Sequence, residues 1–262
     1  QQTMLFLNRR GLSGFVSCRS CGKSIRCPHC DVTLSLHKDG SLRCHYCGYR
    51  IPMPKNCPSC GSPYISGFRA GTQQIEREVH RLFPQARVLR MDYDTTRTRE
   101  SYEQILSAFG NGQADILVGT QMIVKGHDFP DVTLVGIVAA DISLYASDYR
   151  AAERTFQLLT QAVGRAGRGS KAGEAVIQTY MPEHYSIQAA VKQDYEAFYR
   201  QEIAYRNLMG YPPVETMMGI YLSAGDLEKL ESCAEQLAEW IRNAHVEGLC
   251  LIGPADAALA RK

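Results

Sequence analysis

The sequence has 262 residues, of which 45% are hydrophobic and 21% are charged, and its formal net charge is only +2. This composition is typical of a soluble globular chain whose core is large enough to fold without disulfides. The sequence shows neither the run of about 18 apolar residues that a membrane span requires nor a charged-then-apolar leader, so we expect no membrane insertion and no secretion.

The first predicted element is a strand within residues 2–11, QTMLFLNRRG, which ends in a turn. The chain begins with Gln1 instead of methionine and stops on Arg261 and Lys262. Both ends look cut, and we therefore expect a fragment of a longer protein.

Residues 18–60 hold eight of the 10 cysteines, arranged as four C-x-x-C pairs. Eight disulfide-bonded cysteines would suit a secreted minidomain, and a redox C-x-x-C usually occurs once, beside a βαβ pattern. Thiolates are soft metal ligands, and the two-residue gap lets both sulfurs of one turn reach the same ion. We therefore predict two four-cysteine metal sites, with zinc as the metal and a rubredoxin-like iron site as the alternative.

The residues between the pairs also predict which pairs share a metal. Val32, Leu34 and Leu36 alternate with polar residues, and the Asp-Gly step after them predicts a hairpin turn. This zinc-ribbon pattern groups Cys27, Cys30, Cys44 and Cys47 in an inner site and leaves Cys18, Cys21, Cys57 and Cys60 for an outer site. Sequential pairing of the first two knuckles, across only five residues, would be sterically tight.

The cysteine segment is basic, with seven Lys and Arg residues against two Asp residues. A basic segment fits contact with phosphates or with an acidic partner, and it fits a solvated surface equally well. His29, His37 and His45 lie nearby, but eight cysteines already fill two tetrahedral sites. We therefore expect these rings at the surface or beside the ligands.

Residues 61–181 alternate between predicted strands and helices. The strands are residues 63–69, 86–92, 114–120, 133–141 and 173–181, and the helices are residues 71–84, 99–112 and 148–168. Thr72 is the predicted N-cap of the first helix, whose apolar stripe is Ile75, Val79 and Leu82. The alternation predicts a doubly wound parallel sheet of the α/β class, with the cysteine segment inserted near its N-terminal edge.

Residues 182–262 form a second predicted unit, of the α+β class. A helix within residues 196–213 stops at Gly210 and a double proline, and a strand is predicted in residues 216–224. An amphipathic helix in residues 227–244 and a further strand in residues 248–254 follow. We expect the tyrosines and the tryptophan of this part to serve packing instead of base stacking.

Two motifs carry polar residues that suit phosphate chemistry. Arg165 and Arg168 in QAVGRAGR lie three apart at the predicted end of a helix, where they would share one face and could grip a γ-phosphate. A second set follows a buried strand at its carboxyl end, where α/β sheets place ligands: Gly119, Thr120, Gln121, Lys125, Gly126 and Asp128. Taken singly, Asp128 could instead cap a helix, and the arginines could be surface residues.

The chain resembles the second motor lobe of the bacterial PriA family of replication-restart helicases, also called primosomal protein N′. The resemblance covers essentially the whole chain and rests on the paired C-x-x-C motifs and on NRRG, GTQQIEREVHRLFP, RMDYDTT, GTQMIVKGHDFPDVTLVGIVAAD and QLLTQAVGRAGR. It implies a RecA-like helicase lobe 2 that starts in residues 1–17 and continues in residues 61–181. It also implies a double zinc ribbon inserted in residues 18–60 and part of a C-terminal α+β domain in residues 182–262.

The resemblance also implies roles for single residues. The loop at residues 119–128 resembles helicase motif V, which couples nucleotide to DNA. QAVGRAGR resembles motif VI, which would make Arg165 and Arg168 the arginine fingers and Gln161 a polar contact in the nucleotide site.

The sequence contains no P-loop G-x-x-x-x-G-K-[ST] and no D-E-x-H box. The PriA family carries both on its first lobe, so ATP and Mg²⁺ are expected only together with that lobe. We expect the fragment by itself to be inactive as an ATPase.

For the whole protein, the resemblance implies an ATP-dependent 3′-to-5′ DNA helicase that acts in primosome assembly and in the restart of stalled replication forks. Its expected partners are forked and single-stranded DNA, single-stranded-DNA-binding protein, and primosome and helicase-loading proteins. We expect a monomer in the bacterial cytoplasm, associated with the nucleoid and not with a membrane. The alternative is a non-enzymatic zinc-ribbon module that binds DNA or primosome proteins.

Overall fold

A computed structural model describes residues 2–8, 15–37, 39–67, 71–123 and 128–257. The chain folds into two compact units. The sheet unit consists of Gln1–Leu12, Phe68–Ala146 and Arg150–Glu202, and the cysteine unit consists of Ser13–Gly67, Ser147–Tyr149 and Ile203–Lys262. Among the described residues, no helix is both long and apolar enough to cross a membrane.

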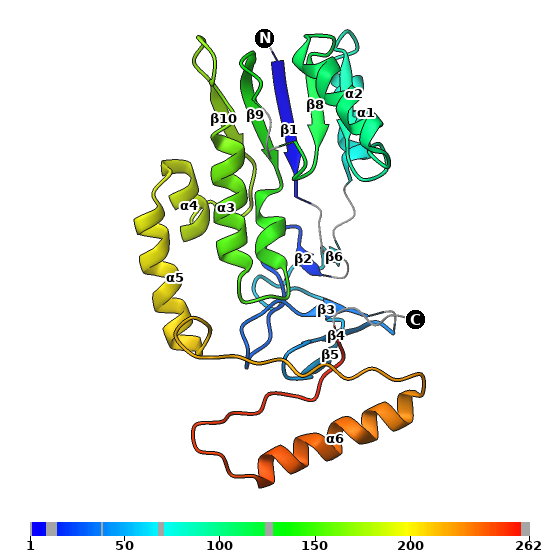
Figure 1. Cartoon of the computed structure of the whole chain (residues 1–262), viewed down its shortest axis with the longest axis vertical. Coiled ribbons are helices and arrows are strands. Elements are labelled where there is room, and N and C mark those ends of the chain that lie inside the picture. Colours follow the sequence, from blue (N-terminus) through cyan, green and yellow to red (C-terminus); the bar gives the residue numbers. More distant parts are fainter. Residues whose placement is uncertain (1, 9–14, 38, 68–70, 124–127, 258–262) are drawn as a thin grey trace. The chain divides into compact units, whose positions relative to one another are not determined.

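The sheet unit is built on five parallel strands in the order β10-β9-β1-β8-β7. The strands are β1 (Gln2–Leu7), β7 (Val88–Met91), β8 (Ile116–Gly119), β9 (Val132–Val138) and β10 (Glu174–Ile177). Figure 1 shows the central strands side by side and pointing the same way. The predicted α/β class with a doubly wound parallel sheet is confirmed.

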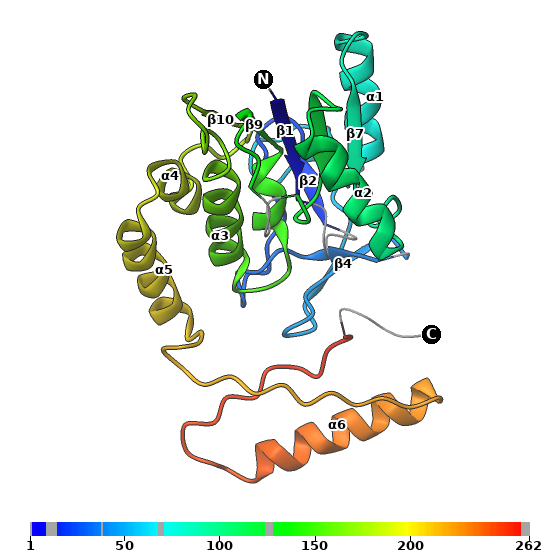
Figure 2. The same ribbon diagram turned by 45° about the horizontal axis from the view of Figure 1, so that its top comes forward.

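Helices cover both faces of this sheet. They are α1 (Thr72–Leu82), α2 (Arg99–Gly110) and α3 (Ala151–Val163). Helix α4 (Tyr185–Lys192) and the short 3₁₀ helix η1 (Ala140–Tyr145) pack against α3, and α5 (Tyr195–Met209) follows α4. The chain steps across the sheet in opposite directions before and after β7, so right-handed crossovers place α1 and α2 on opposite faces (Figure 2). The core between the layers includes Met4, Phe6, Leu117, Val135 and Leu159, all at most 1% exposed.

The start of α1 differs from the prediction by one residue. Gly71 occupies the N-cap, and Thr72 is the first residue of the helix. The Thr72 hydroxyl donates a 2.5 Å hydrogen bond to the Asp92 carboxylate. Because the Thr72 hydroxyl binds Asp92, which follows β7, it does not cap α1. The usual N-cap preference for threonine therefore predicts the wrong residue here.

Two small antiparallel sheets organise the cysteine unit. One pairs β2 (Val16–Cys18) with β6 (Ile65–Gly67), and the other orders β3 (Ser35–Leu36), β4 (Ser41–Arg43) and β5 (Arg50–Pro52). The predicted hairpin turn lies between β3 and β4, where Gly40 adopts φ +77° and Asp39 accepts a hydrogen bond from the Ser41 amide. Val16, Leu34 and Leu42, each at most 1% exposed, lie in the core of this unit.

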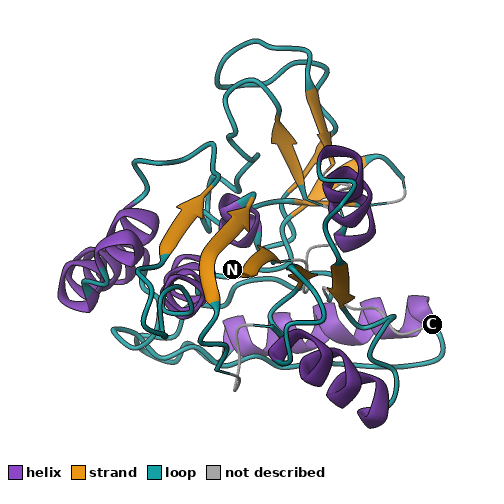
Figure 3. Cartoon of the chain, turned by 90° about the horizontal axis from the view of Figure 1, so that it is seen from above, coloured by secondary structure: helices purple, strands orange, loops and turns teal. Residues whose placement is uncertain are grey.

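The region after α5 contains fewer regular elements than predicted. Helix α6 (Leu227–Asn243) forms as expected, and Asp226 caps it by accepting from the Lys229 amide. The strands predicted in residues 216–224 and 248–254 are wrong, because both stretches are irregular, as the loops around α6 in Figure 3 show. A strand needs a neighbour that pairs with its backbone, and the described strands pair with neither segment. Helix α4 is an element that the sequence reading missed.

Candidate metal and nucleotide sites

All four C-x-x-C pairs adopt one backbone conformation. In each, the amide after the second cysteine donates to the carbonyl of the first, with N–O distances of 2.9, 3.0, 3.1 and 2.8 Å in chain order. The amide of the first cysteine also donates to the carbonyl five residues later in every pair. This shared turn aims both thiols of a pair in the same direction, as a metal knuckle requires.

The structure gathers the eight thiols into two groups, Cys18/Cys21/Cys57/Cys60 and Cys27/Cys30/Cys44/Cys47, in which all the sulfurs lie within 4.8 Å of one another. The Sγ–Sγ distances are 3.6 Å for Cys18–Cys60, 3.8 Å for Cys21–Cys57 and 3.6 Å for Cys27–Cys47. Tetrahedral zinc with Zn–S bonds of about 2.3 Å requires sulfurs roughly 3.8 Å apart. Both groups therefore fit a tetrahedral thiolate-bound ion, in the nested arrangement and not in the sequential one.

The thiols respond differently to their surroundings. Burial raises the pKa of Cys44 to about 11, and burial together with neighbouring thiols raises that of Cys30 as well. In the outer group, the Cys21 amide lowers the pKa of Cys18 to about 6. A cation is the natural counter-charge for thiolates in so apolar a place as the inner group, and this again favours a bound metal.

The predicted phosphate-site residues divide between two edges of the sheet. Thr120 and Gln121 follow β8 at the carboxyl edge, where the Thr120 amide donates to the carbonyl of Met91 at the end of β7. The Gln121 side chain donates to Asn8, the residue that follows β1. Asn8 therefore joins the candidate site, although the sequence analysis did not name it; a polar residue directly after a buried strand is a usable signal.

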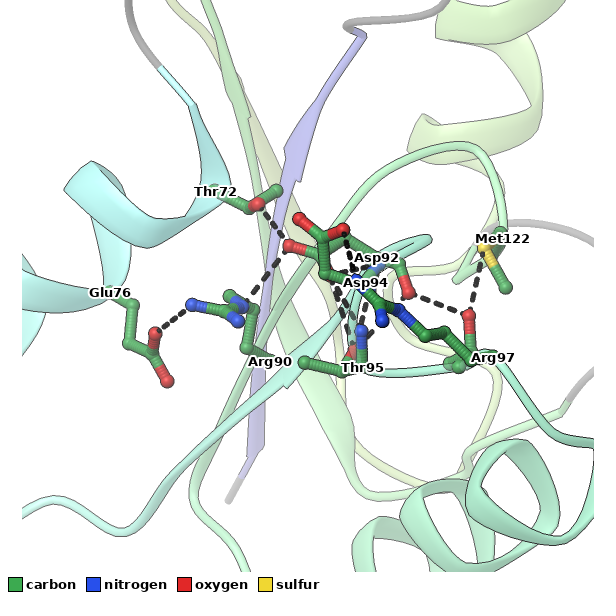
Figure 4. Close-up of polar contacts among 9 residues, drawn as sticks. Thr72, Glu76, Arg90, Asp92, Asp94, Thr95, Arg97 and Met122 are labelled. Carbon is green, nitrogen blue, oxygen red and sulfur yellow. Dashed lines mark hydrogen bonds and ion pairs between the residues drawn. The ribbon is translucent and has the colours of Figure 1, made fainter.

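Asp92, which follows β7, is the centre of a buried polar network at the same edge. Figure 4 shows Thr72, Arg90 and Thr95 converging on it. Its carboxylate accepts from the Thr72 hydroxyl and from the Thr95 amide and forms a 3.1 Å ion pair with Arg90, which also binds Glu76. Burial alone would raise the pKa of Asp92, but these donors and the Arg90 charge lower it.

Asp128, Arg165 and Arg168 lie at the opposite, amino edge. The Gly167 amide donates to the carbonyl of Val132, the first residue of β9, so the chain that carries both arginines sits where β9 begins. Arg168 donates to Asp128 over 3.4 Å. Burial and the Arg168 charge lower the pKa of Arg165, while Asp128 acts in the opposite direction.

Two expectations about this set are therefore corrected. Helix α3 ends at Val163, so Arg165 and Arg168 lie in a turn beyond the helix and not on one helical face. That turn is fixed by Gly167, whose φ of +72° is left-handed and which packs directly on Gly173. In addition, Asp128 does not share the carboxyl edge with Thr120, because the connection must return to the amino edge before the parallel strand β9 can start.

The other predicted residues are placed as follows. Gly119 is the last residue of β8, and a Cβ there would lie 2.6 Å from the Met91 carbonyl oxygen, so only glycine permits this approach. Gln161 is an exposed residue near the end of α3. Lys125 and Gly126 lie outside the described residues.

Comparisons with known proteins match the chain along its whole length. The PriA DNA helicase Cys-rich region domain matches residues 27–52, and the helicase conserved C-terminal domain matches residues 66–170. Replication restart protein PriA of Bacillus subtilis (strain 168) is 48% identical over 262 residues, which are 100% of this chain and 32% of that protein. Its counterpart from Synechocystis sp. is 44% identical over 266 residues, again 100% and 32%, and that from Haemophilus influenzae is 38% identical over 262 residues, 100% and 36%.

The parallel sheet, the match to the helicase C-terminal domain and the two four-cysteine groups define a helicase motor domain with a zinc-ribbon insertion. The chain belongs to the replication restart protein PriA family. It spans about a third of the length of the curated relatives that it matches.

Proposed function

We propose that this chain is the second motor lobe of an ATP-dependent DNA helicase that restarts stalled replication forks. The observation that carries the proposal is the gathering of Arg165, Arg168 and Asp128 at the amino edge of a helicase-type sheet. The chain itself has no P-loop, so the phosphates and Mg²⁺ are bound by a first lobe, and this lobe completes the site.

The chemistry of the arginine turn supports a role in phosphoryl transfer. Arg165 is a partly buried cation whose pKa is lowered by burial and by the like charge of Arg168. An arriving γ-phosphate relieves both the loss of solvation and the repulsion, and it offers oxygens to two guanidinium forks. Asp128 holds Arg168 until then, and Gln161 on α3 is proposed as a polar contact to the same nucleotide.

The connection from β8 to β9 is proposed to couple nucleotide to DNA. It begins at the carboxyl edge with Gly119, Thr120 and Gln121 and reaches the amino edge at Asp128. The hydroxyl and amide groups at its start suit contacts to DNA phosphates, and Lys125 and Gly126 belong to the same connection. Because one short segment connects both edges, a change of ligand at one edge has a direct covalent route to the other.

Zinc is proposed as the resident metal of both cysteine groups. Cys18, Cys21, Cys57 and Cys60 would hold the outer ion, and Cys27, Cys30, Cys44 and Cys47 the inner one. Zinc held by four thiolates supplies folding free energy and no reactivity, since no coordination position stays open. The basic cysteine segment then offers DNA or a primosome protein a rigid surface.

The role of the whole protein is proposed from its relatives, which carry the name replication restart protein. It would translocate 3′-to-5′ as a monomer on forked and single-stranded DNA. Its proposed partners are single-stranded-DNA-binding protein and the primosome and helicase-loading proteins. The place of action would be the bacterial cytoplasm, at the nucleoid.

The test is an Arg168→Ala substitution in the complete enzyme. Arginine fingers contribute on the order of 10³ to 10⁵ in rate, or roughly 4 to 7 kcal/mol of barrier, so ATPase and unwinding should be lost. Arg168→Lys should fail as well, because a point charge does not reproduce the bidentate fork. Arg99→Ala, on an exposed arginine of α2 that pairs with Glu103, is the matched control and should keep activity.

Fork affinity without nucleotide is measured on the same proteins and should survive, since the arginine contacts ATP. If ATPase stays near wild type while fork affinity collapses, the arginines belong to the DNA track and the proposed roles are wrong.

A further inference from the structure

One of the four cysteine knuckles breaks the rule that the other three follow. The residue after the second cysteine has positive φ in all four, and it is glycine in three: Gly22 (φ 73°), Gly48 (φ 77°) and Gly61 (φ 74°). In the knuckle of Cys27 and Cys30 this position is Asp31, with φ 46°. An L side chain is disfavoured in this conformation, although aspartate tolerates it better than most. Asp31 therefore adopts a backbone conformation that glycine would adopt more easily, and the contacts of its side chain indicate why it is present.

The Asp31 carboxylate joins two parts of the cysteine unit. One oxygen pairs with the Arg26 guanidinium at 2.9 Å, and Arg26 also donates to the Asp31 carbonyl, so the start of the knuckle is tied to its end. The other oxygen accepts a 3.1 Å hydrogen bond from the hydroxyl of Tyr205, in the last turns of α5. A glycine could make neither side-chain contact.

A second tyrosine holds the same knuckle by its backbone. The Tyr211 hydroxyl donates a 2.5 Å hydrogen bond to the carbonyl of Cys30, and Tyr211 is only 3% exposed. Its ring stacks on Tyr149 with a centroid distance of 4.9 Å. The Arg206 guanidinium lies over the Tyr149 ring, 5.2 Å from the ring centroid. Arg206 in turn donates to the Pro212 carbonyl, which fixes the turn that presents Tyr211.

The outer site is held differently. Its two knuckles are joined by a 2.8 Å hydrogen bond between Ser20 and Ser62, and Arg19 donates to Ser66 and to the Gly67 carbonyl. The tyrosine beside this site, Tyr64, is 69% exposed. The hydroxyl contacts of Tyr205 and Tyr211 are made to a knuckle of the inner site.

We propose that Tyr205 and Tyr211 are positioning residues for the inner metal site, which they hold in its ligand geometry through Asp31 and the Cys30 carbonyl. The inference rests on the proposed zinc occupancy of that site. Groups that orient metal ligands from outside typically change metal affinity by 10- to 100-fold when removed. The linkage is reciprocal, so an ion in the inner site also stabilises the turn in residues 205–211.

The first test follows zinc release from the 262-residue chain to a colorimetric chelator. Wild type should release two zinc ions per chain, and Tyr211→Phe, which keeps the stacked ring and removes only the hydroxyl, should release one of them on the order of tenfold faster. Tyr205→Phe should act in the same direction. Tyr64→Phe is the matched control and should leave both rates unchanged. In Cys21→Ser, where only the inner site keeps four thiols, Tyr211→Phe should still accelerate release.

Two substitutions of Asp31 distinguish the effect of its side-chain contact on zinc release from the effect of its backbone conformation. Asp31→Asn tolerates the positive φ and keeps an acceptor for Tyr205, so its release rate should stay within a few-fold of wild type. Asp31→Gly favours the same φ but removes the acceptor, and it should release the inner ion faster despite its easier backbone. If Asp31→Gly releases zinc as slowly as wild type, the proposed role of Tyr205 is overturned.

The second test reads the linkage from the other side, by hydrogen exchange of residues 205–211. Cys47→Ser, which breaks the inner site, should increase exchange there, whereas Cys60→Ser, which breaks the outer site, should not. Exchange in β1 reports that the sheet unit remains folded. Equal exchange in both variants, or unchanged release in Tyr211→Phe, overturns the inference alone. Fewer than two zinc ions in wild type overturns the proposed zinc sites and the inference with them.

Discussion

Asp92 offers the sharpest single perturbation in the sheet unit, because a neighbour of the same residue type provides its control. Asp92 is 7% exposed, and its carboxylate accepts hydrogen bonds from the Thr72 hydroxyl and the Thr95 amide. It also pairs with Arg90 at 3.1 Å. Asp92→Ala removes all of these at once and leaves Arg90 with Glu76 as its remaining carboxylate.

The size of the effect follows from these contacts. Removing one partner of a buried ion pair costs about 3 to 5 kcal/mol, and each buried donor left unpaired costs about 1 to 3 kcal/mol. Glu76 offsets part of the first cost, and water at the sheet edge satisfies part of the second. We therefore expect a loss of about 3 kcal/mol of unfolding free energy, a large share of the roughly 5 to 15 kcal/mol of a typical domain.

Urea unfolding followed by far-ultraviolet circular dichroism measures this loss. Asp94→Ala is the control, since the exposed Asp94 side chain pairs with Arg97 at 3.7 Å and the substitution keeps the Asp94 amide that donates to Asp92. An exposed pair contributes at most about 1 kcal/mol, so this variant should stay close to wild type. If Asp92→Ala destabilises the chain no more than Asp94→Ala does, the network at the end of β7 is not the anchor that its geometry indicates.

The pH dependence gives the sign of the same effect. The pKa of Asp92 is lowered in the folded state, so its contribution is present above the unfolded value of about 3.9 and is lost as the pH falls through the lower folded value. Asp92→Asn keeps the shape and removes this titration. The stability difference between wild type and Asp92→Asn should therefore shrink below about pH 4, and a difference that stays constant down to pH 2 would contradict the assignment.

Three further outcomes are expected. Gly167→Ala should lower the free energy of urea unfolding by at least about 2 kcal/mol, because the φ of Gly167 is +72° and the new Cβ would lie 2.5 Å from the Gly173 amide nitrogen. Gly112 has the same φ of +72° but open space around it, so Gly112→Ala should cost only the conformational part, about 1 kcal/mol. Chelation of the metals should unfold residues 18–60 and leave the sheet unit folded, since thiolate-bound zinc contributes about 10 to 16 kcal/mol to its own segment, and loss of hydrogen-exchange protection in β1 would contradict this. The isolated chain should show no ATPase above background with or without single-stranded DNA, and robust turnover by highly purified chain would mean that the nucleotide site has been misplaced.

The parts of the fold that the sequence predicts are those decided by local chemistry. Runs such as residues 114–120 and 133–141 are apolar and β-branched throughout, and only a parallel sheet that is covered on both faces buries such strands. The cysteine grouping follows from the short hairpin between Cys30 and Cys44, which brings their pairs together before any longer contact forms. In both cases, few arrangements satisfy the pattern.

The predictions that the structure contradicts fail because of contacts between residues that are distant in the sequence. Thr72 is a residue type that favours the N-cap, but its hydroxyl donates a hydrogen bond to the carboxylate of Asp92, twenty positions away. Helix α3 is predicted through Arg168 but ends at Val163, and beyond it Gly167 adopts a left-handed conformation and packs on Gly173. The strands predicted after α5 have the right residues and lack a partner among the described strands. Neither a remote acceptor nor a missing partner leaves a local signal.

The division of the phosphate residues between two edges was predictable in principle, and it bears directly on the proposed coupling. Two parallel strands that follow each other must be joined by a segment that returns from the carboxyl edge to the amino edge, so the two ends of residues 119–128 cannot serve one ligand site. The structure holds this connection at both edges. Ile123 is fully buried beside Gly119, and Phe129 is buried edge-on against Phe109 at 5.0 Å. Both described ends of the connection are thus anchored in the core of the sheet unit, as the proposed coupling between DNA and nucleotide requires.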